Sequence, residues 1–185
     1  AIAKTGSPCI KIYIEDGFGA ASDWPLLNDD TLQRIRKAAD KANLQVWAHA
    51  NAIDMYHIAL NHQVDGIAHG LWNWQWPSDQ DNPPVTAPLD RLINSKTAYM
   101  PTIQVMLSLQ GMYDSNTLND TRRQKVLPAA LLQWYLTHEG QWFKREISED
   151  FGGLPEARIF ELSGYGVSRA KQATAYLASK NHPLL

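Results

Sequence analysis

The sequences VWAHA (residues 46–50) and GIAHG (residues 66–70) decide the fold prediction for this chain. Each is a short, mostly apolar run with a histidine near its end, His49 in the first and His69 in the second. Between them, residues 51–60 carry apolar side chains at helical spacing. A strand, a helix and a second strand in this order predict two parallel strands joined by a crossover helix.

The same alternation extends to both sides of these segments. Short runs of apolar, β-branched and aromatic residues are predicted to be strands at residues 9–14, 44–48, 64–68 and 98–103. Helical spacing follows at residues 28–43, 51–60 and 89–93, after residue 120 with Pro128 in a first turn, and in a last helix carrying Val167, Ala170, Thr174 and Leu177. This pattern predicts an α/β fold with a parallel sheet, and short strands followed closely by helices are typical of a β/α barrel. A complete barrel needs roughly 250 residues and about eight such units, so about half of one is expected here.

Several single residues predict where these elements begin and end. Asn28 and Asn51 precede two of the helices, and a short side-chain oxygen at such a position can accept a first-turn N–H. Asn43 is a plausible end for the first helix. Pro101 lies within the last predicted strand, where it should interrupt the pairing.

Composition narrows the classes of partner. The chain has 185 residues, of which 44% are hydrophobic and 19% charged, as expected for one globular domain over residues 1–185. A net charge of −2 gives no electrostatic basis for binding nucleic acid or an anionic membrane. No apolar run approaches the ~18 residues that a membrane span needs. The single cysteine, Cys9, excludes an intrachain disulfide without fixing the compartment. Neither a nucleic acid nor a membrane is therefore expected as a partner.

The last four residues, His182 to Leu185, predict a continuation of the fold. Leu184 and Leu185 follow a predicted helix and a proline turn, as the first residues of a strand would. Domains normally end in solvated, polar segments. We therefore expect the chain to be a fragment of a longer protein.

Three side chains on or at the ends of the predicted strands are candidate metal ligands. Lys11 lies within the first strand, His49 ends the second and His69 ends the third. In β/α barrels the chemistry lies at the carboxyl ends of the strands. Imidazole nitrogens on adjacent strand ends can converge on one ion, as a catalytic zinc site requires. Taken alone, each histidine is more typical of a buried structural residue, and Lys11 of a lysine whose amine reaches solvent.

These segments resemble the amidohydrolase superfamily of metal-dependent hydrolases. Residues 46–50 and 64–70 resemble its strand-five and strand-six motifs, separated by a helix of similar length. The sequence CIKI at residues 9–12 resembles the strand-four motif of the subgroup related to imidazolonepropionases and prolidase-like dipeptidases. Residues 99–102, YMPT, resemble the strand-seven segment. The resemblance implies part of a TIM-type (β/α)8 barrel, about strands four to seven with their helices.

The resemblance also implies a metal site. His49 and His69 would bind a divalent metal, with zinc as the expected ion, and one or two ions in the intact protein. Lys11 would be carboxylated, which turns a costly inward ammonium into an anion that can hold cations. The family's His-x-His pair is expected before this chain and its strand-eight aspartate after Leu185. No general base is assigned, because neither Asp16 nor Asp65 fits that aspartate's motif.

The function implied is hydrolysis of an amide, cyclic amide or peptide-like bond of a small-molecule substrate by metal-activated water. The fragment alone is expected to be inactive, and to associate with itself or with the missing half of the barrel. Two alternatives stay open. One is a non-catalytic binding module that grips a ring-bearing ligand with a tryptophan-lined loop, and the other is a deaminase or lyase on the same scaffold.

Candidate substrate contacts follow the strand ends. Trp72, Trp74 and Trp76 alternate, so in an extended segment they would share one side and form an aromatic wall over the site. The interpretation that these residues form a loop packed onto the barrel is slightly favoured over the aromatic wall. Tyr56 and Glu15 also follow strand ends, as substrate contacts or as ordinary helix-start and loop residues.

Overall fold

The computed structural model describes residues 2–17, 24–73, 86–114, 116–117 and 120–185. The chain forms two compact units. The first comprises Ala1–Asp16, Trp24–Ile103 and Gly166–Leu185, and the second comprises Gly17–Asp23 and Gln104–Tyr165. The first unit contains a parallel sheet, whereas the described residues of the second are helices and their connections.

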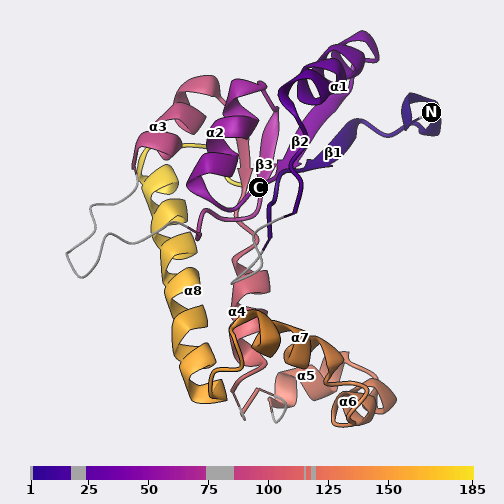
Figure 1. Cartoon of the computed structure of the whole chain (residues 1–185), viewed down its shortest axis with the longest axis vertical. Coiled ribbons are helices and arrows are strands. Elements are labelled where there is room, and N and C mark those ends of the chain that lie inside the picture. Colours follow the sequence, from indigo (N-terminus) through magenta and orange to yellow (C-terminus); the bar gives the residue numbers. More distant parts are fainter. Residues whose placement is uncertain (1, 18–23, 74–85, 115, 118–119) are drawn as a thin grey trace. The chain divides into compact units, whose positions relative to one another are not determined.

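A four-stranded parallel sheet forms the centre of the first unit, with its strands in sequence order (Figure 1). The strands are β1 (Cys9–Tyr13), β2 (Gln45–His49), β3 (Gly66–Ala68) and β4 (Ala98–Met100). The register aligns Tyr13 with His49 and His49 with Ala68. The predicted α/β fold with a parallel sheet is confirmed, and the barrel stays a prediction.

One face of the sheet is covered by helices. They are α1 (Asp29–Lys41), α2 (Ile53–Asn61), α3 (Thr86–Ser95) and the part of α8 (Glu156–Ser179) that lies in the first unit. Alternate strand residues such as Val46, Ile67 and Tyr99 point into this shared core, and all three are almost completely buried. Because successive strand residues face opposite sides, the other residues of the strands form the second face.

The second face of the sheet is more open. Tyr13 is 48% exposed and Met100 37% exposed, so in the described residues this face lacks the helical cover of the first. Trp47 lies across it above Gly66, where an added Cβ would stand 2.6 Å from the indole ring. The glycine of the GIAHG sequence is therefore needed for this close approach.

The residues predicted to begin and end the helices and strands do so only in part. Asn28 caps α1 by accepting the Thr31 N–H at 2.8 Å. The predicted cap at Asn51 is wrong, because Ala52 precedes α2 and its cap makes no side-chain hydrogen bond. The predicted strand at residues 98–103 is too long, because β4 ends at Met100 just before Pro101.

The amino ends of the strands are held by a charged network. The Asp65 carboxylate accepts the Val46 N–H at 2.7 Å and pairs with Arg36 at 2.6 Å. Arg36 also donates to the backbone carbonyls of Leu44 and Gln63, which ties α1 to the starts of β2 and β3. Asp65 thus stabilises the edge of the sheet away from the predicted chemistry, in agreement with its rejection as a general base.

The end of the chain pairs with the sheet. Leu184 forms an isolated parallel bridge with Tyr99, and the Leu185 N–H donates to the Tyr99 carbonyl at 3.0 Å. Tyr99 also pairs with Ile67 of β3. The strand-like geometry predicted for the final apolar pair is therefore confirmed as a single bridge beside β4.

The second unit contains helices that the sequence pattern predicted incompletely. They are α4 (Ile103–Gly111), α5 (Thr121–Val126), α6 (Ala129–Tyr135), α7 (Trp142–Asp150) and the first part of α8. Helix α4 and helix α7 were not predicted. The core of this unit is small, with Ile159 fully buried and the Tyr113 hydroxyl donating to the Lys144 carbonyl at 3.1 Å. None of the helices in the described parts of the chain is both long and apolar enough to cross a membrane.

Candidate functional site

Polar side chains gather at the carboxyl ends of the parallel strands. Lys11 lies within β1, and Glu15 follows the end of β1 by two residues. His49 is the last residue of β2, and His69 comes directly after β3. Because parallel strands end at one edge of their sheet, these four side chains share one region of the first unit.

The three predicted metal ligands lie close together. The His49 and His69 rings meet edge to face with their centroids 4.6 Å apart. The Lys11 Nζ atom lies 3.5 Å from His69 Nε2. The Tyr13 ring stacks on His49 with a centroid distance of 4.1 Å, so it covers one side of that imidazole. The structure therefore brings Lys11, His49 and His69 into one cluster.

The orientation of His69 is fixed by contacts on its ring and its backbone. Its Nδ1 atom lies 2.8 Å from the Thr102 hydroxyl oxygen, and its carbonyl accepts the Tyr56 hydroxyl at 3.0 Å. His69 and Thr102 adopt positive φ angles of 84° and 43°, which cost non-glycine residues of order 1–3 kcal/mol each. Such strain at two residues in contact is typical of functional sites.

Electrostatics keep His69 neutral. Burial, His49 and Lys11 lower the pKa of His69 to about 4, in decreasing order of effect. With Nδ1 donating to Thr102, the lone pair of the neutral ring is on Nε2, the nitrogen that faces Lys11. A neutral imidazole with one nitrogen held by an oxygen is the usual form of a metal-binding histidine.

A buried carboxylate holds His49. The Glu15 side chain is 0% exposed, and its Oε2 atom lies 3.1 Å from His49 Nε2. The same oxygen accepts a hydrogen bond from the Asn51 amide at 2.7 Å. When Nε2 of His49 is the donor to Glu15, its lone pair is on Nδ1. Burial together with the charge of Glu15 also raises the pKa of Tyr13, the residue that stacks on His49.

Sequence reasoning missed part of this arrangement. Glu15 was predicted only as a loop residue or substrate contact, and Asn51 only as a helix cap. Both follow strand ends, which is the one local signal that links them to the site. Thr102 was noticed as part of the strand-seven resemblance, but not as the partner of His69.

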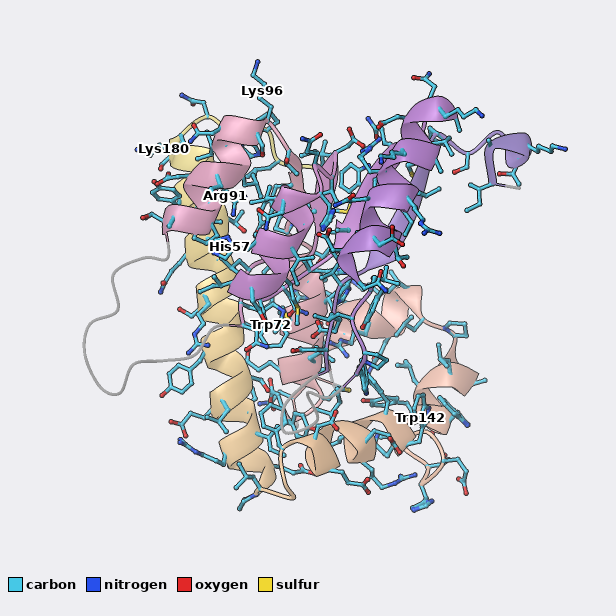
Figure 2. All side chains as sticks on the ribbon, turned by 45° about the horizontal axis from the view of Figure 1, so that its top comes forward. His57, Trp72, Arg91, Lys96, Trp142 and Lys180 are labelled. Carbon is cyan, nitrogen blue, oxygen red and sulfur yellow. The ribbon has the colours of Figure 1, made fainter. Side chains whose placement is uncertain are left out.

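The predicted substrate contacts lie in different surroundings. Tyr56 is fully buried, and its hydroxyl supports the His69 backbone, so we assign it to positioning of His69 rather than to substrate contact. Trp72 is half-buried just beyond the amino end of α2 (Figure 2), and its backbone N–H donates to the Asn51 carbonyl at 3.1 Å. Trp74 and Trp76 lie outside the described residues.

The described side chains do not by themselves form a metal site. Within the described ranges, no group of three or more His, Cys, Asp and Glu residues could hold a metal ion. Lys11 as an ammonium would repel a cation, whereas a carboxylated Lys11 would add anionic oxygens beside the two imidazoles. The donor set therefore fits a divalent metal only if Lys11 is modified or if further ligands come from the rest of the protein.

The low pKa of His69 predicts a loss of stability in acid. The unfolded histidine takes up a proton near pH 6.5, whereas the folded one resists until about pH 4. Stability is therefore full above pH 6.5 and falls as the pH drops from 6.5 toward 4. We expect a loss of about 1–2 kcal/mol after discounting for the half-exposed ring.

Urea unfolding of the wild type and of His69→Gln at pH 7 and pH 4.5 measures this contribution. The stability gap between the two proteins should shrink by about 1–2 kcal/mol at the lower pH. A gap that stays the same at both pH values would show that His69 does not resist protonation.

The sequence matches no family model and no curated protein. One solved structure to which the chain is similar is a crystal structure described only as that of an uncharacterized protein. The two are 18% identical, with a TM-score of 0.46. The match covers 81% of this chain and 32% of the other, so this chain spans about a third of the length of the protein that it matches.

Proposed function

We propose that this chain is part of a metal-dependent hydrolase of the amidohydrolase type. In this proposal His49 and His69 bind a divalent cation, with zinc as the expected ion, and carboxylated Lys11 is a further ligand. The reaction is hydrolysis of an amide, cyclic amide or peptide-like bond. The observation that carries the proposal is the meeting of these three side chains at the carboxyl ends of adjacent parallel strands.

The strand order supports a β/α barrel as the scaffold. The four strands follow one another in sequence order, without the reversal that creates the binding crevice of a doubly wound sheet. Helices cover the Val46 and Ile67 face, whereas Tyr13 and Met100 on the opposite face stay substantially exposed. An outer helical layer with the second sheet face turned inward is the arrangement of a barrel.

The residues of the cluster and their hydrogen-bond partners have distinct parts in the proposed chemistry. A bound divalent cation supplies a Lewis acid that lowers the pKa of water to about 7 and polarises the bond to be broken. Glu15 and Thr102 fix the ring orientation of His49 and His69, so that one nitrogen of each ring is held by oxygen. Burial is the largest cause of the low pKa of His69 and does not depend on the state of Lys11, so the ring stays neutral, as ligation requires.

Lys11 provides the test of this proposal. In the intact protein, Lys11→Arg keeps the positive charge and the long stem but cannot be carboxylated. We expect metal affinity to fall at least about tenfold, because one anionic ligand is lost. Lys4→Arg, an exposed lysine in the first turn of the chain, is the matched control and should bind metal as the wild type does.

Metal content of the purified proteins, together with titration after chelation, measures the effect. An intact protein that purifies without a divalent metal and binds none on titration would overturn the proposal. If Lys11→Arg bound the metal with unchanged affinity, Lys11 would not be a ligand. It would then be a lysine whose amine reaches solvent.

A further inference from the structure

The second unit contains an apolar groove that is separate from the proposed metal site. The groove has a volume of about 700 Å³ and runs between α4, the segment from α5 to α6, and α7. Its apolar lining includes Val105, Leu109, Leu127, Leu131, Leu132 and Phe143. Side chains of this kind are normally buried, yet Val105 is 50% exposed and Leu131 47% exposed. Exposed apolar surface concentrated in one groove is typical of binding sites.

A polar pocket adjoins the groove. It has a volume of about 250 Å³, and its lining includes Asp114, Gln141, Lys144 and Glu156. Three residues line both spaces, namely Met112, Arg123 and Tyr135. An apolar compartment that opens onto a polar one fits a ligand with an apolar chain and a polar head.

Arg123 stands at the junction of the two spaces. Three other cations of this unit are ion-paired, since the Arg122, Lys144 and Arg158 nitrogens lie 2.6, 2.7 and 2.5 Å from carboxylate oxygens. Among the described residues, Arg123 has no carboxylate oxygen within 4.0 Å of its guanidinium nitrogens. Its Nη2 atom lies near the end of α4, 3.8 Å from where a Cβ on Gly111 would stand. A half-buried guanidinium beside an apolar groove is suited to receive an anion from a ligand.

The charges around Arg123 limit the kind of anion. Lys144 is already paired with Glu156, and the Asp114 carboxylate lines the same pocket. A multiply charged head such as a phosphate would be repelled by these two carboxylates. A single carboxylate can make two parallel hydrogen bonds to one guanidinium, which Arg123 alone can supply.

We propose that the second unit binds a single-chain amphiphile with one carboxylate, such as a fatty acid. The acyl chain occupies the apolar groove and the carboxylate pairs with Arg123. The groove is within the roughly 300–1,000 Å³ range of small-molecule sites. This site is independent of the metal proposal, because every residue that lines it belongs to the second unit.

Two probes with the same chain separate the contributions of the groove and of Arg123. Calorimetric titration of the full chain with monomeric dodecanoate and with dodecanol should give tighter binding of dodecanoate by about tenfold. Arg123→Gln should bring dodecanoate down to the affinity of dodecanol while leaving dodecanol unchanged. Retained dodecanol binding shows that the groove of this variant is folded.

Arg122→Gln is the matched control, because Arg122 is the exposed neighbour that pairs with Asp120. It should bind both probes as the wild type does. Leu131→Asp places a charge in the groove and should abolish binding of both. Equal affinity for the two probes in the wild type, or the same loss in Arg122→Gln and Arg123→Gln, would overturn the proposal. The proposal would also be wrong if the chain bound neither probe and formed a dimer through Leu131. The groove would then be an interface between two copies of the chain.

Discussion

In the intact protein, the proposed metal site predicts that His49→Ala and His69→Ala will each lose most of the bound metal and nearly all hydrolytic activity. A tightly held zinc ion contributes about 10–16 kcal/mol, shared among about four ligands. Removing one ligand therefore costs about 3 kcal/mol, which weakens metal binding by about 100-fold. Activity should fall further, because the remaining ligands no longer fix the position of the ion.

Two histidines on α2 and at its end provide matched controls for this experiment. The Nδ1 atom of His57 accepts a hydrogen bond from Arg91 of α3 at 2.8 Å, and Figure 2 shows the two side chains on neighbouring helices. His62 pairs with Asp29 at 3.0 Å. His57→Ala and His62→Ala remove the same ring from the same unit and should keep the metal. Metal stoichiometry that is unchanged in both His49→Ala and His69→Ala would refute the assignment of these residues.

The elements that carry the candidate site could be predicted because their signals are local. The apolar runs before His49 and His69 are short and lie next to helical spacing, so each strand is visible within a few residues. Parallel pairing then puts both histidines at one edge, as the register of β2 with β3 confirms. The prediction that Lys11 lies in a neighbouring strand is confirmed by the pairing of β1 with β2.

The partners of these histidines could not be predicted because they are distant in sequence. Glu15 meets His49 across 34 positions, and Thr102 meets His69 across 33. Asn51 is a good cap by sequence, yet its side-chain amide donates to the buried Glu15 carboxylate, which would be costly without donors. At this position a tertiary contact with Glu15 outweighs the local preference of Asn51 for capping a helix.

Tyr56 shows a similar limit. Its position after a strand end suggested a substrate contact, but in the structure the Tyr56 side chain lies in the buried core and its hydroxyl bonds to the His69 carbonyl. The spacing of apolar residues predicts helix α2. The direction in which its buried face points depends on where the sheet lies, which the local sequence does not determine. The second unit is harder still, since its helices keep large apolar side chains exposed and so weaken the usual contrast between an apolar and a polar face.

Tyr99→Ala is expected to destabilise the first unit by about 4 kcal/mol or more. The Tyr99 ring is 0% exposed in the core between the sheet and its helices, so its removal leaves a large cavity. Its hydroxyl also accepts the N–H of buried Leu71 at 3.2 Å, and a buried donor without a partner costs about 1–3 kcal/mol. Leu71 follows His69 by two residues, so the same change loosens the backbone that carries this histidine.

Urea unfolding of the full chain, monitored by tryptophan fluorescence, measures the loss of stability. Two further variants separate the contribution of the ring from that of the hydroxyl and from the effect of removing an exposed ring. Tyr99→Phe keeps the ring and removes only the hydroxyl, so it should cost about 1–2 kcal/mol. Tyr165→Ala removes a ring that is 47% exposed and should cost less than about 1 kcal/mol. If Tyr99→Ala were as stable as Tyr165→Ala, Tyr99 would not be the core residue that joins β4 to the loop after His69. A Tyr99→Phe variant as unstable as Tyr99→Ala would instead assign the effect to the Leu71 hydrogen bond, because the packed ring would then contribute little.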